Sequence, residues 1–306
     1  MYVGIDIGGT SIKYGLVNVA GQVSKSGKIK TDHSLEGLLT DLTTIITNFQ
    51  KEEQVEGVGI SAPGIIQSDG FMTTGGAIRE LYGVNLKKLI EKRVHLPIFV
   101  ENDANAAAIA EQWVGNAQGK INYLCVVIGT GMGGGIIIND QIYRGAHGMA
   151  GEFGFMVTKD VTVANDVEAA SLNQTASVIG GICNQYNKLQ PDAEPIFSSE
   201  KIMELAEAKD ANAVKVMADF YHNLGVGLLN LISCFDPEVV LIGGGISENQ
   251  QFMENLRRSL TDLETNHQSI KFLMDKTFAE VLPAKLKNNA GLIGAVYQVH
   301  KVVQGK

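Results

Sequence analysis

Apolar and polar positions alternate in short runs at the start of the chain and then change to a helical spacing. Residues 2–7 are apolar and β-branched, the next three are typical of a tight turn, and residues 11–18 resume the alternation, which predicts two strands joined by that turn. Leucine and isoleucine at every third or fourth position predict a helix over 34–49. Apolar runs at 55–60 and 98–100 predict further strands, and an alanine-rich run predicts a helix over 104–113.

The same pattern begins again in the second half of the chain. Strands are predicted over 123–128 and 136–139 on either side of a glycine-rich turn, and over 239–242. Helical spacing covers about 171–187, 199–207, 210–234 and 288–303. Two successive strand–turn–strand units, each followed by helices, predict a duplicated α/β architecture with two lobes. We expect residues 1–117 plus about 288–306 to form the N-terminal lobe and residues 118–287 the C-terminal lobe.

Composition narrows the class of protein. The 306 residues are 45% apolar and 19% charged, which excludes wholesale disorder. A net charge of −8 argues against a broad nucleic-acid or anionic-membrane surface. No apolar run approaches about 18 residues, and the N-terminus has no basic start of the kind that signal peptides carry. Three scattered cysteines fit a reduced compartment, so we expect a cytoplasmic protein with neither a membrane nor a nucleic acid as partner.

Phosphate loop 1, which we define as residues 6–13, contains the first candidate chemistry. Two glycines between strands let backbone N–H groups approach phosphate oxygens, and a hydroxyl and a cation follow them. Asp6 ends its strand, where it can hold Mg²⁺ through water, the kind of ligand that Mg²⁺ favours. The candidate nucleotide-binding residues here are Asp6, Gly8, Gly9, Thr10 and Lys13. An ordinary tight hairpin is the alternative.

Two further glycine loops repeat this arrangement. Phosphate loop 2, residues 129–133, contributes Thr130, Gly131 and Gly133, and again lies between two strands. The adenosine loop, Gly243-Gly244-Gly245, follows a strand and precedes a helix predicted to begin near Glu248, so a flat nucleobase or an anion can approach it closely. Neither of the two phosphate loops has the sequence context of a P-loop or a Rossmann motif. The combined order of the three loops favours a nucleotide held between two lobes.

Four motifs together resemble the ROK family, whose name stands for repressors, open reading frames and kinases. They are Asp6-Ile7-Gly8-Gly9-Thr10, Glu101-Asn102-Asp103-Ala104-Asn105, Gly129-Thr130-Gly131-Met132-Gly133 and Gly243-Gly244-Gly245. The resemblance runs in register from residue 2 to about 300. It implies the two-lobed actin-like, ribonuclease-H-like ATPase fold, a homodimer, and transfer of the ATP γ-phosphate to a sugar hydroxyl.

A carboxylate and an amide stand side by side where a buried strand is predicted to meet a helix. Such a pair can accept a hydroxyl proton and orient the sugar oxygen for in-line attack. The family resemblance places the catalytic base at Asp103 and a sugar hydrogen bond at Asn102. Helix capping is the alternative, because Asn and Asp are preferred there.

The resemblance also implies other sugar-binding positions. Glu152 and Glu168 match the family's two sugar-binding glutamates, and carboxylates accept hydrogen bonds from neighbouring hydroxyls. For each, an exposed or capping Glu is the alternative. Gly64 lies where the family lets its backbone approach the sugar. Residues 65–84 predict a long loop with a small hairpin, and residues 73–85 are expected to form the far wall of the site.

The sequence departs from the family pattern at two points. The family usually has His three residues after the first Glu, where this chain has Phe155. It usually carries a Cys-rich zinc motif before the second Glu, but residues 159–167 contain no Cys. Since zinc needs about four N or S ligands and His147 supplies only one, we expect no structural zinc. Phe155 favours a substrate other than plain glucose.

These observations predict a hexose kinase that uses ATP and Mg²⁺. The acceptor remains open among a β-glucoside, glucose, N-acetylmannosamine and fructose. A non-catalytic sugar sensor or a filament or chaperone ATPase is the first alternative class. A sugar-responsive repressor is the second; since phosphate loop 1 begins at Asp6, we expect no room for a DNA-binding segment and do not favour this class.

Overall fold

A computed structural model describes residues 1–162, 166–274 and 278–305. The chain divides into two compact units. The first contains Met1–Lys120, Gly135–Gly151 and Lys285–Lys306, and the second contains Ile121–Gly134 and Glu152–Ala284. The boundary between the units falls between Gly134 and Gly135, inside a strand. The first unit therefore includes residues 135–151, which we expected in the C-terminal lobe. The lobe boundaries expected from the sequence stay a prediction.

The first unit is built on a five-stranded sheet. Its order is β3 (Val23–Lys30), β2 (Ser11–Val17), β1 (Tyr2–Ile7), β4 (Gly57–Ala62) and β7 (Ile98–Asn102). The first three strands are antiparallel neighbours, whereas β4 and β7 run parallel to β1. The β1–β2 hairpin therefore confirms the strand–turn–strand pattern at the N-terminus.

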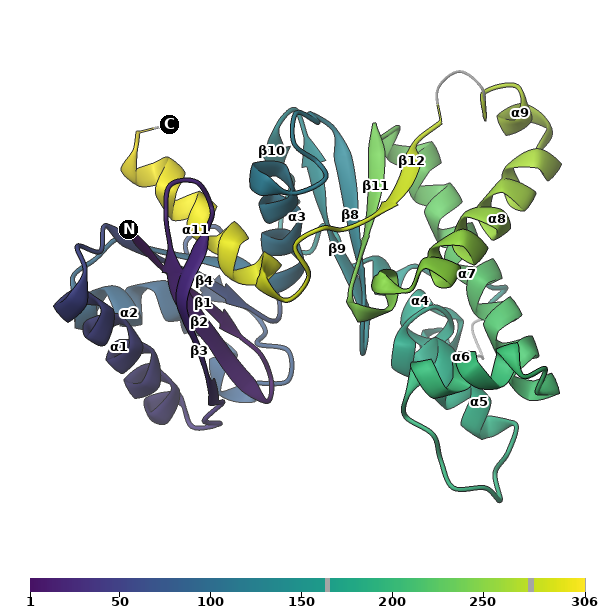
Figure 1. The fold of residues 1–306 in the computed structure, drawn as a ribbon, viewed down its shortest axis with the longest axis horizontal. Helices are drawn as coiled ribbons and strands as arrows, with labels where there is room; N and C mark the ends of the chain where they lie inside the picture. The colour runs from purple at the N-terminus through teal and green to yellow at the C-terminus, as the bar shows by residue number, and fades with distance from the viewer. Residues whose placement is uncertain (163–165, 275–277, 306) are drawn as a thin grey trace. The chain divides into compact units, whose positions relative to one another are not determined.

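Helices cover both faces of this sheet (Figure 1). On one face, α1 (Leu35–Glu52) and α2 (Leu86–Val94) bury their apolar stripes against it. On the other face, α3 (Asp103–Val114) and α11 (Ala290–Val303) pack against it and against each other. The helix α2 was not predicted, because charged residues separate its three buried apolar positions.

The second sheet repeats the arrangement. Its order is β10 (Gln141–Ile142), β9 (Met132–Ile138), β8 (Tyr123–Ile128), β11 (Val239–Gly243) and β12 (Glu280–Pro283). As in the first sheet, one edge is antiparallel: here β10 pairs with β9 in that direction. On the other side, β11 runs parallel to β8, and β12 runs parallel to β11. The predicted duplication is confirmed.

The helices of the second unit differ widely in length. They comprise α4 (Leu172–Thr175), the π-helical turn η4 (Val178–Cys183), α5 (Asn184–Lys188), α6 (Ser199–Glu207), α7 (Ala211–Phe235), α8 (Gln250–Asn266) and α9 (Gln268–Lys271). The rings of Phe220, Tyr221 and Phe252 join α7 to α8. The helical region predicted over 171–187 is divided at η4, because Gly180 and Gly181 lie directly against the backbone of α4.

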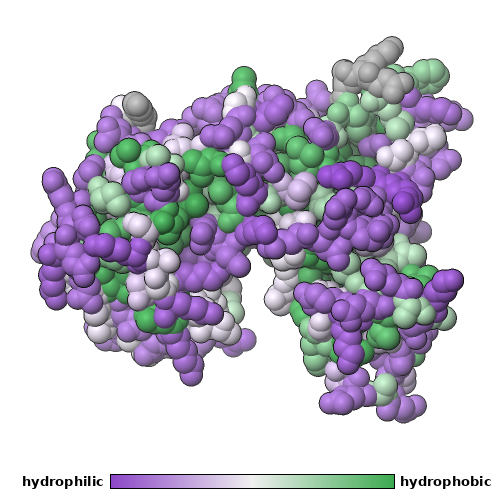
Figure 2. Space-filling view, in the orientation of Figure 1, coloured by the Kyte–Doolittle hydropathy of each residue, from purple (hydrophilic) through white to green (hydrophobic). Residues whose placement is uncertain are grey.

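Shorter elements complete the described chain. They are β5 (Phe71–Met72), β6 (Val84–Asn85) and the 3₁₀ turns η1 (Arg79–Leu81), η2 (Phe153–Phe155), η3 (Glu168–Ala170), η5 (Gly245–Glu248) and η6 (Lys287–Asn289). Hydrophilic residues cover most of the face shown in Figure 2, with apolar residues in smaller patches. Within the described ranges, the helices are too short or too polar for any of them to cross a bilayer.

Candidate functional site

Phosphate loop 1 is the turn between β1 and β2, and it is held from within its own unit. The N–H of Gly8 donates to the carbonyl of Ser11 at 3.0 Å, and the hydroxyl of Thr31 donates to the carbonyl of Gly8 at 2.6 Å. Thr10 at its tip is exposed. The hairpin register places Asp6 opposite Lys13. The hairpin therefore carries a hydroxyl and a cation, which suit an anion, and a carboxylate, which suits a metal ion that accompanies a phosphate.

Asp6 is half-buried, and neighbouring elements hold its carboxylate. The hydroxyl of Ser61 on β4 donates to its Oδ1 at 2.8 Å. Burial raises the pKa of Asp6, while the Ser61 hydrogen bond and the charge of Lys13 act in the opposite direction. A Cβ on Gly291 of α11 would lie 2.6 Å from the same oxygen, so the helix backbone packs directly on the carboxylate. Three elements thus fix the position of Asp6.

Asn102 and Asp103 stand at the junction of β7 and α3. The side-chain oxygen of Asn102 accepts from the N–H groups of Ala104 and Asn105 at 2.9 and 3.0 Å, so Asn102 caps the helix. Its amide nitrogen donates to the carbonyl of Gly64 at 2.9 Å, which uses one of its two hydrogens. Asp103 is exposed, and its Oδ1 accepts from Ala104 N–H at 2.8 Å. The structure thus brings Gly64, Asn102 and Asp103 together.

A buried carboxylate for which the sequence analysis predicted no separate role, Glu101, is hydrogen-bonded to the backbone of Asn102. Glu101 is 1% exposed, and its Oε1 accepts from Asn102 N–H at 3.1 Å and from the Asn105 amide at 3.2 Å. Its Oε2 forms an ion pair with Arg144. Arg144 also lies 6.0 Å from the centre of the Phe99 ring. Glu101 therefore ties the backbone of Asn102 to a distant arginine of the same unit.

Gly64 begins the loop expected to form the wall of the site. Its φ is +99°, and a Cβ would lie 2.3 Å from the carbonyl oxygen of Thr74, so only glycine fits. The expected small hairpin is present as β5 and β6. Beyond it, the loop is tied to the chain elsewhere by Gln67, whose amide donates to the carbonyl of His147 at 3.0 Å. His147 itself is exposed.

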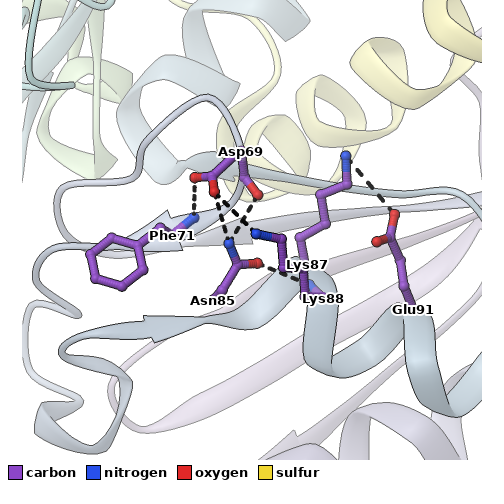
Figure 3. A network of polar contacts seen from close by, with 6 residues as sticks. All are labelled: Asp69, Phe71, Asn85, Lys87, Lys88 and Glu91. Carbon is purple, nitrogen blue, oxygen red and sulfur yellow. Dashed lines mark hydrogen bonds and ion pairs between the residues drawn. The ribbon is translucent and has the colours of Figure 1, made fainter.

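A polar network fixes the start of α2 next to this hairpin (Figure 3). Asp69 accepts from the N–H of Phe71 at 3.0 Å and from the amide of Asn85 at 3.1 Å, and it lies 3.6 Å from the ammonium of Lys88. The hydrogen bond from Phe71, aided by the Lys88 charge, lowers the pKa of Asp69 against the opposing effect of burial. Lys87 and Glu91 form a separate pair one turn apart. The wall segment is thus ordered by side chains that the sequence analysis had not assigned.

In the second unit, phosphate loop 2 joins β8 to β9. The N–H of Gly129 donates to the carbonyl of Gly131 at 2.9 Å, which closes the turn. Thr130 and Gly131 are exposed, and Gly133 is half-buried in β9. A Cβ on Gly129 would meet no atom closer than 4.0 Å, so space for a ligand remains above the turn.

The adenosine loop follows β11. Gly244 has a φ of +92°, and a Cβ there would lie 2.0 Å from the carbonyl oxygen of Ile128. Its carbonyl accepts from the hydroxyl of Ser247 at 2.8 Å. A Cβ on Gly245 meets no atom within 4 Å, so a flat group has room to approach there. The helix predicted near Glu248 begins as η5 and continues as α8.

Glu152 and Glu168 lie on two neighbouring segments of the second unit. The N–H of Leu172 donates to the carbonyl of Met156 at 2.9 Å, and an isolated bridge joins Val157 to Ser171. Glu152 is half-buried, and burial raises its pKa. Glu168 is exposed at the start of η3.

Phe155 ends η2, one short turn after Glu152, with 54% of its surface exposed. An imidazole that accepts and donates hydrogen bonds is thus replaced by an exposed apolar ring. Among the residues for which positions are given, no three His, Cys, Asp or Glu side chains gather in a way that would hold a metal. The predicted absence of structural zinc stays a prediction.

Comparisons with known proteins agree with these motifs. Residues 2–302 match the ROK family. A β-glucoside kinase of Listeria monocytogenes is 35% identical over 295 residues, which cover 95% of each chain. A glucokinase of Halalkalibacterium halodurans is 30% identical over 327 aligned positions, covering 97% of this chain and 94% of the relative. A ROK glucokinase of Streptomyces griseus, solved with glucose and AMPPNP, has a TM-score of 0.79 at 29% identity, covering 98% of this chain and 99% of that structure.

Proposed function

This chain belongs to the ROK family, and we propose that it is an ATP-dependent sugar kinase that phosphorylates a hydroxyl of a hexose or hexoside. The observation that carries the proposal is the junction of β7 and α3, where Asp103 is exposed beside a fixed Asn102. Relatives named as kinases support the same activity. The two-lobed actin-like ATPase fold of such kinases agrees with the two matching sheets.

Each proposed site residue has a distinct task in this reaction. Asp103 accepts the proton of the sugar hydroxyl as its oxygen attacks the γ-phosphorus and ADP leaves. The remaining amide hydrogen of Asn102 donates to a sugar oxygen, and the Gly64 backbone borders that position. Glu152 and Glu168 accept hydrogen bonds from other sugar hydroxyls. Positioning by these groups supplies much of the rate enhancement, since phosphoryl transfer needs little covalent chemistry from the protein.

The glycine loops are proposed to bind the nucleotide. Gly8, Gly9, Thr10 and Lys13 in one unit, and Thr130, Gly131 and Gly133 in the other, are assigned to the phosphates. Gly243, Gly244 and Gly245 are assigned to the adenosine, and the open space at Gly245 suits a flat base. Mg²⁺ would neutralise charge on the phosphates, and Asp6 is a fitting outer ligand because Mg²⁺ usually retains waters beside one or two carboxylates.

The acceptor is proposed to be larger than plain glucose. The exposed ring of Phe155 offers an apolar surface close to Glu152, on which a second sugar or another aglycone can stack. The name of the Listeria relative, β-glucoside kinase, points the same way. Glucose, N-acetylmannosamine and fructose are the other acceptors to be tested. A homodimer and a cytoplasmic location, where ATP is abundant, complete the proposal.

We expect sugar affinity to weaken as the pH falls. Glu152 accepts sugar hydrogen bonds as a carboxylate, and its raised pKa means that it becomes protonated at a higher pH than an exposed Glu does. Hydrogen bonds to a charged group are worth about 1.5–3 kcal/mol, so full protonation should weaken binding by about 10- to 100-fold. Calorimetric titration of sugar without nucleotide, from pH 8 down to about pH 4, just below the usual pKa of an exposed Glu, measures this.

The matched variant is Glu152→Gln, which removes the titrating group. It should bind sugar more weakly than the wild type at neutral pH and lose less affinity as the pH falls. A wild-type affinity that changes with pH no more than that of Glu152→Gln would show that Glu152 does not bind the sugar as a carboxylate.

Product analysis tests the activity itself. Incubation with Mg·ATP and gentiobiose or glucose, followed by mass spectrometry, should yield a sugar monophosphate and ADP in equal amounts. Formation of ADP without a phosphorylated sugar would show that the protein hydrolyses ATP and does not phosphorylate these sugars.

A further inference from the structure

Phosphate loop 2 is held at both ends by one short segment of the second unit. At its start, the carbonyl of Gly129 accepts from the N–H of Val178 at 2.9 Å. At its end, the N–H of Met132 donates to the side-chain oxygen of Asn173 at 2.8 Å. Between these points the loop is exposed. The position of its exposed backbone is therefore set by α4 and the start of η4.

Asn173 is itself rigidly placed. The hydroxyl of Ser177 donates to the carbonyl of Asn173 at 2.6 Å and accepts from the N–H of Gly180 at 2.9 Å. A Cβ on Gly180 would lie 2.0 Å from that same carbonyl oxygen, so the π-helical turn packs directly against it. The carboxamide therefore extends toward the loop from a backbone with little freedom.

The same carboxamide also contacts the segment that carries Glu152. A Cβ on Gly154 would lie 2.1 Å from the side-chain oxygen of Asn173, so Gly154 packs against it without space between them. A Cβ on Gly131, in the loop, would lie 3.3 Å from the same oxygen. One side chain thus contacts both phosphate loop 2 and the residue two positions after Glu152.

From these contacts we infer that Asn173 is a positioning residue that couples sugar binding at Glu152 to nucleotide binding at phosphate loop 2. The inference rests on the proposed function and assigns a residue that neither the sequence motifs nor the proposed site includes. A shift of Gly154 on sugar binding has to move the carboxamide, because close-packed atoms cannot absorb it. The carboxamide in turn moves the N–H of Met132. Sugar and nucleotide then influence each other reciprocally.

The test is the effect of sugar on nucleotide affinity in Asn173→Ala. The dissociation constant of Mg·AMPPNP is measured calorimetrically with and without a saturating concentration of a sugar. The sugar is the one that gives the highest turnover with Mg·ATP among glucose, gentiobiose, N-acetylmannosamine and fructose, or glucose if none gives turnover. Couplings of this kind amount to about 5- to 150-fold. We expect sugar to tighten nucleotide binding within that range in the wild type and by less than about 2-fold in the variant. Without sugar, the variant should bind nucleotide about 5- to 10-fold more weakly, as loss of one hydrogen bond predicts.

Two further variants separate coupling from a general loss of structure. Asn187→Ala removes an asparagine of α5 whose amide and oxygen bridge to the backbone of Ile196 at 3.0 and 2.9 Å, outside both loops. It should lose stability without losing the coupling. Asn173→Asp keeps the acceptor for Met132 N–H, so it should retain the coupling even though its negative charge weakens nucleotide binding with and without sugar alike.

The outcomes are distinct from those of the proposed function. An active kinase in which Asn173→Ala keeps the wild-type coupling factor would overturn this inference alone. Equal loss of coupling in Asn187→Ala and Asn173→Ala would also overturn it, because the effect would then be structural. Absence of turnover on every sugar would refute the proposed function, whereas the calorimetric comparison needs no turnover and would still decide the role of Asn173.

Discussion

Replacing Asp103 with Asn is expected to lower kcat by about 10²- to 10⁴-fold, the usual contribution of a general base. Asn has the same shape and can still accept the N–H of Ala104 through its side-chain oxygen, as Asp103 does at 2.8 Å. It cannot accept the sugar proton. Because Asp103 is exposed and Asn has the same size, the fold should be kept and the sugar dissociation constant should change by a few-fold at most.

A matched control isolates the chemistry from helix capping. Asp210 is the N-cap of α7, and its oxygen accepts from Ala213 N–H at 2.8 Å. Asp210→Asn makes the same chemical change at another helix start and should leave kcat unaffected. Steady-state kinetics of both variants, with sugar binding measured separately, provide the comparison. Turnover of Asp103→Asn near the wild-type value would remove Asp103 from the role of base.

Replacing Glu111 with Ala is expected to produce a large loss of stability in the first unit. Glu111 is fully buried in α3. One carboxylate oxygen accepts from the N–H groups of Lys285 and Leu286, both at 2.7 Å, and the other accepts from Asn116 N–H at 2.8 Å. Hydrogen bonds to a charged group contribute about 1.5–3 kcal/mol each, so losing the carboxylate that accepts these three should lower the free energy of unfolding by about 3 kcal/mol or more.

Denaturant unfolding measures this change, with the transition of the first unit followed by the fluorescence of Trp113, the one tryptophan of the chain. Glu36→Ala is the control, since Glu36 is exposed and pairs with Arg93 on the surface. Exposed pairs contribute about 0–1 kcal/mol, and the control should fall in that range. A loss of similar size in both variants would show that the three backbone hydrogen bonds of Glu111 contribute little.

The parts of the structure that local sequence determines were predicted well. Alternating residues around Gly8 and Gly9 specify a hairpin, and its repetition around phosphate loop 2 predicted the second sheet. Asn102 could be assigned either to capping or to sugar binding, and the structure shows the cap with one amide hydrogen remaining. A local pattern is enough in these cases, because the partners lie within a few residues.

The contacts of side chains whose partners lie far away in the sequence could not be predicted, for a physical reason. Glu101 pairs with Arg144, 43 positions away, and Glu111 accepts from Lys285, 174 positions away. Asn173 contacts Met132 across 41 positions. A polar residue with such a partner looks like any surface residue in the sequence, because only the folded chain brings the two together. The one available signal was that Glu101 begins the family motif that contains Asn102 and Asp103.

A coupled assay of ADP release with Mg·ATP, run on glucose, fructose, mannose, N-acetylmannosamine, N-acetylglucosamine, cellobiose and gentiobiose, tests the central claim most directly. The account predicts turnover on at least one of these sugars, with a disaccharide preferred if the Phe155 ring binds the aglycone. It also predicts that Asp103→Asn abolishes nearly all of that turnover. A folded protein that binds AMPPNP but releases no ADP with any of these sugars would contradict the assignment as a kinase of these acceptors and would favour a sugar sensor.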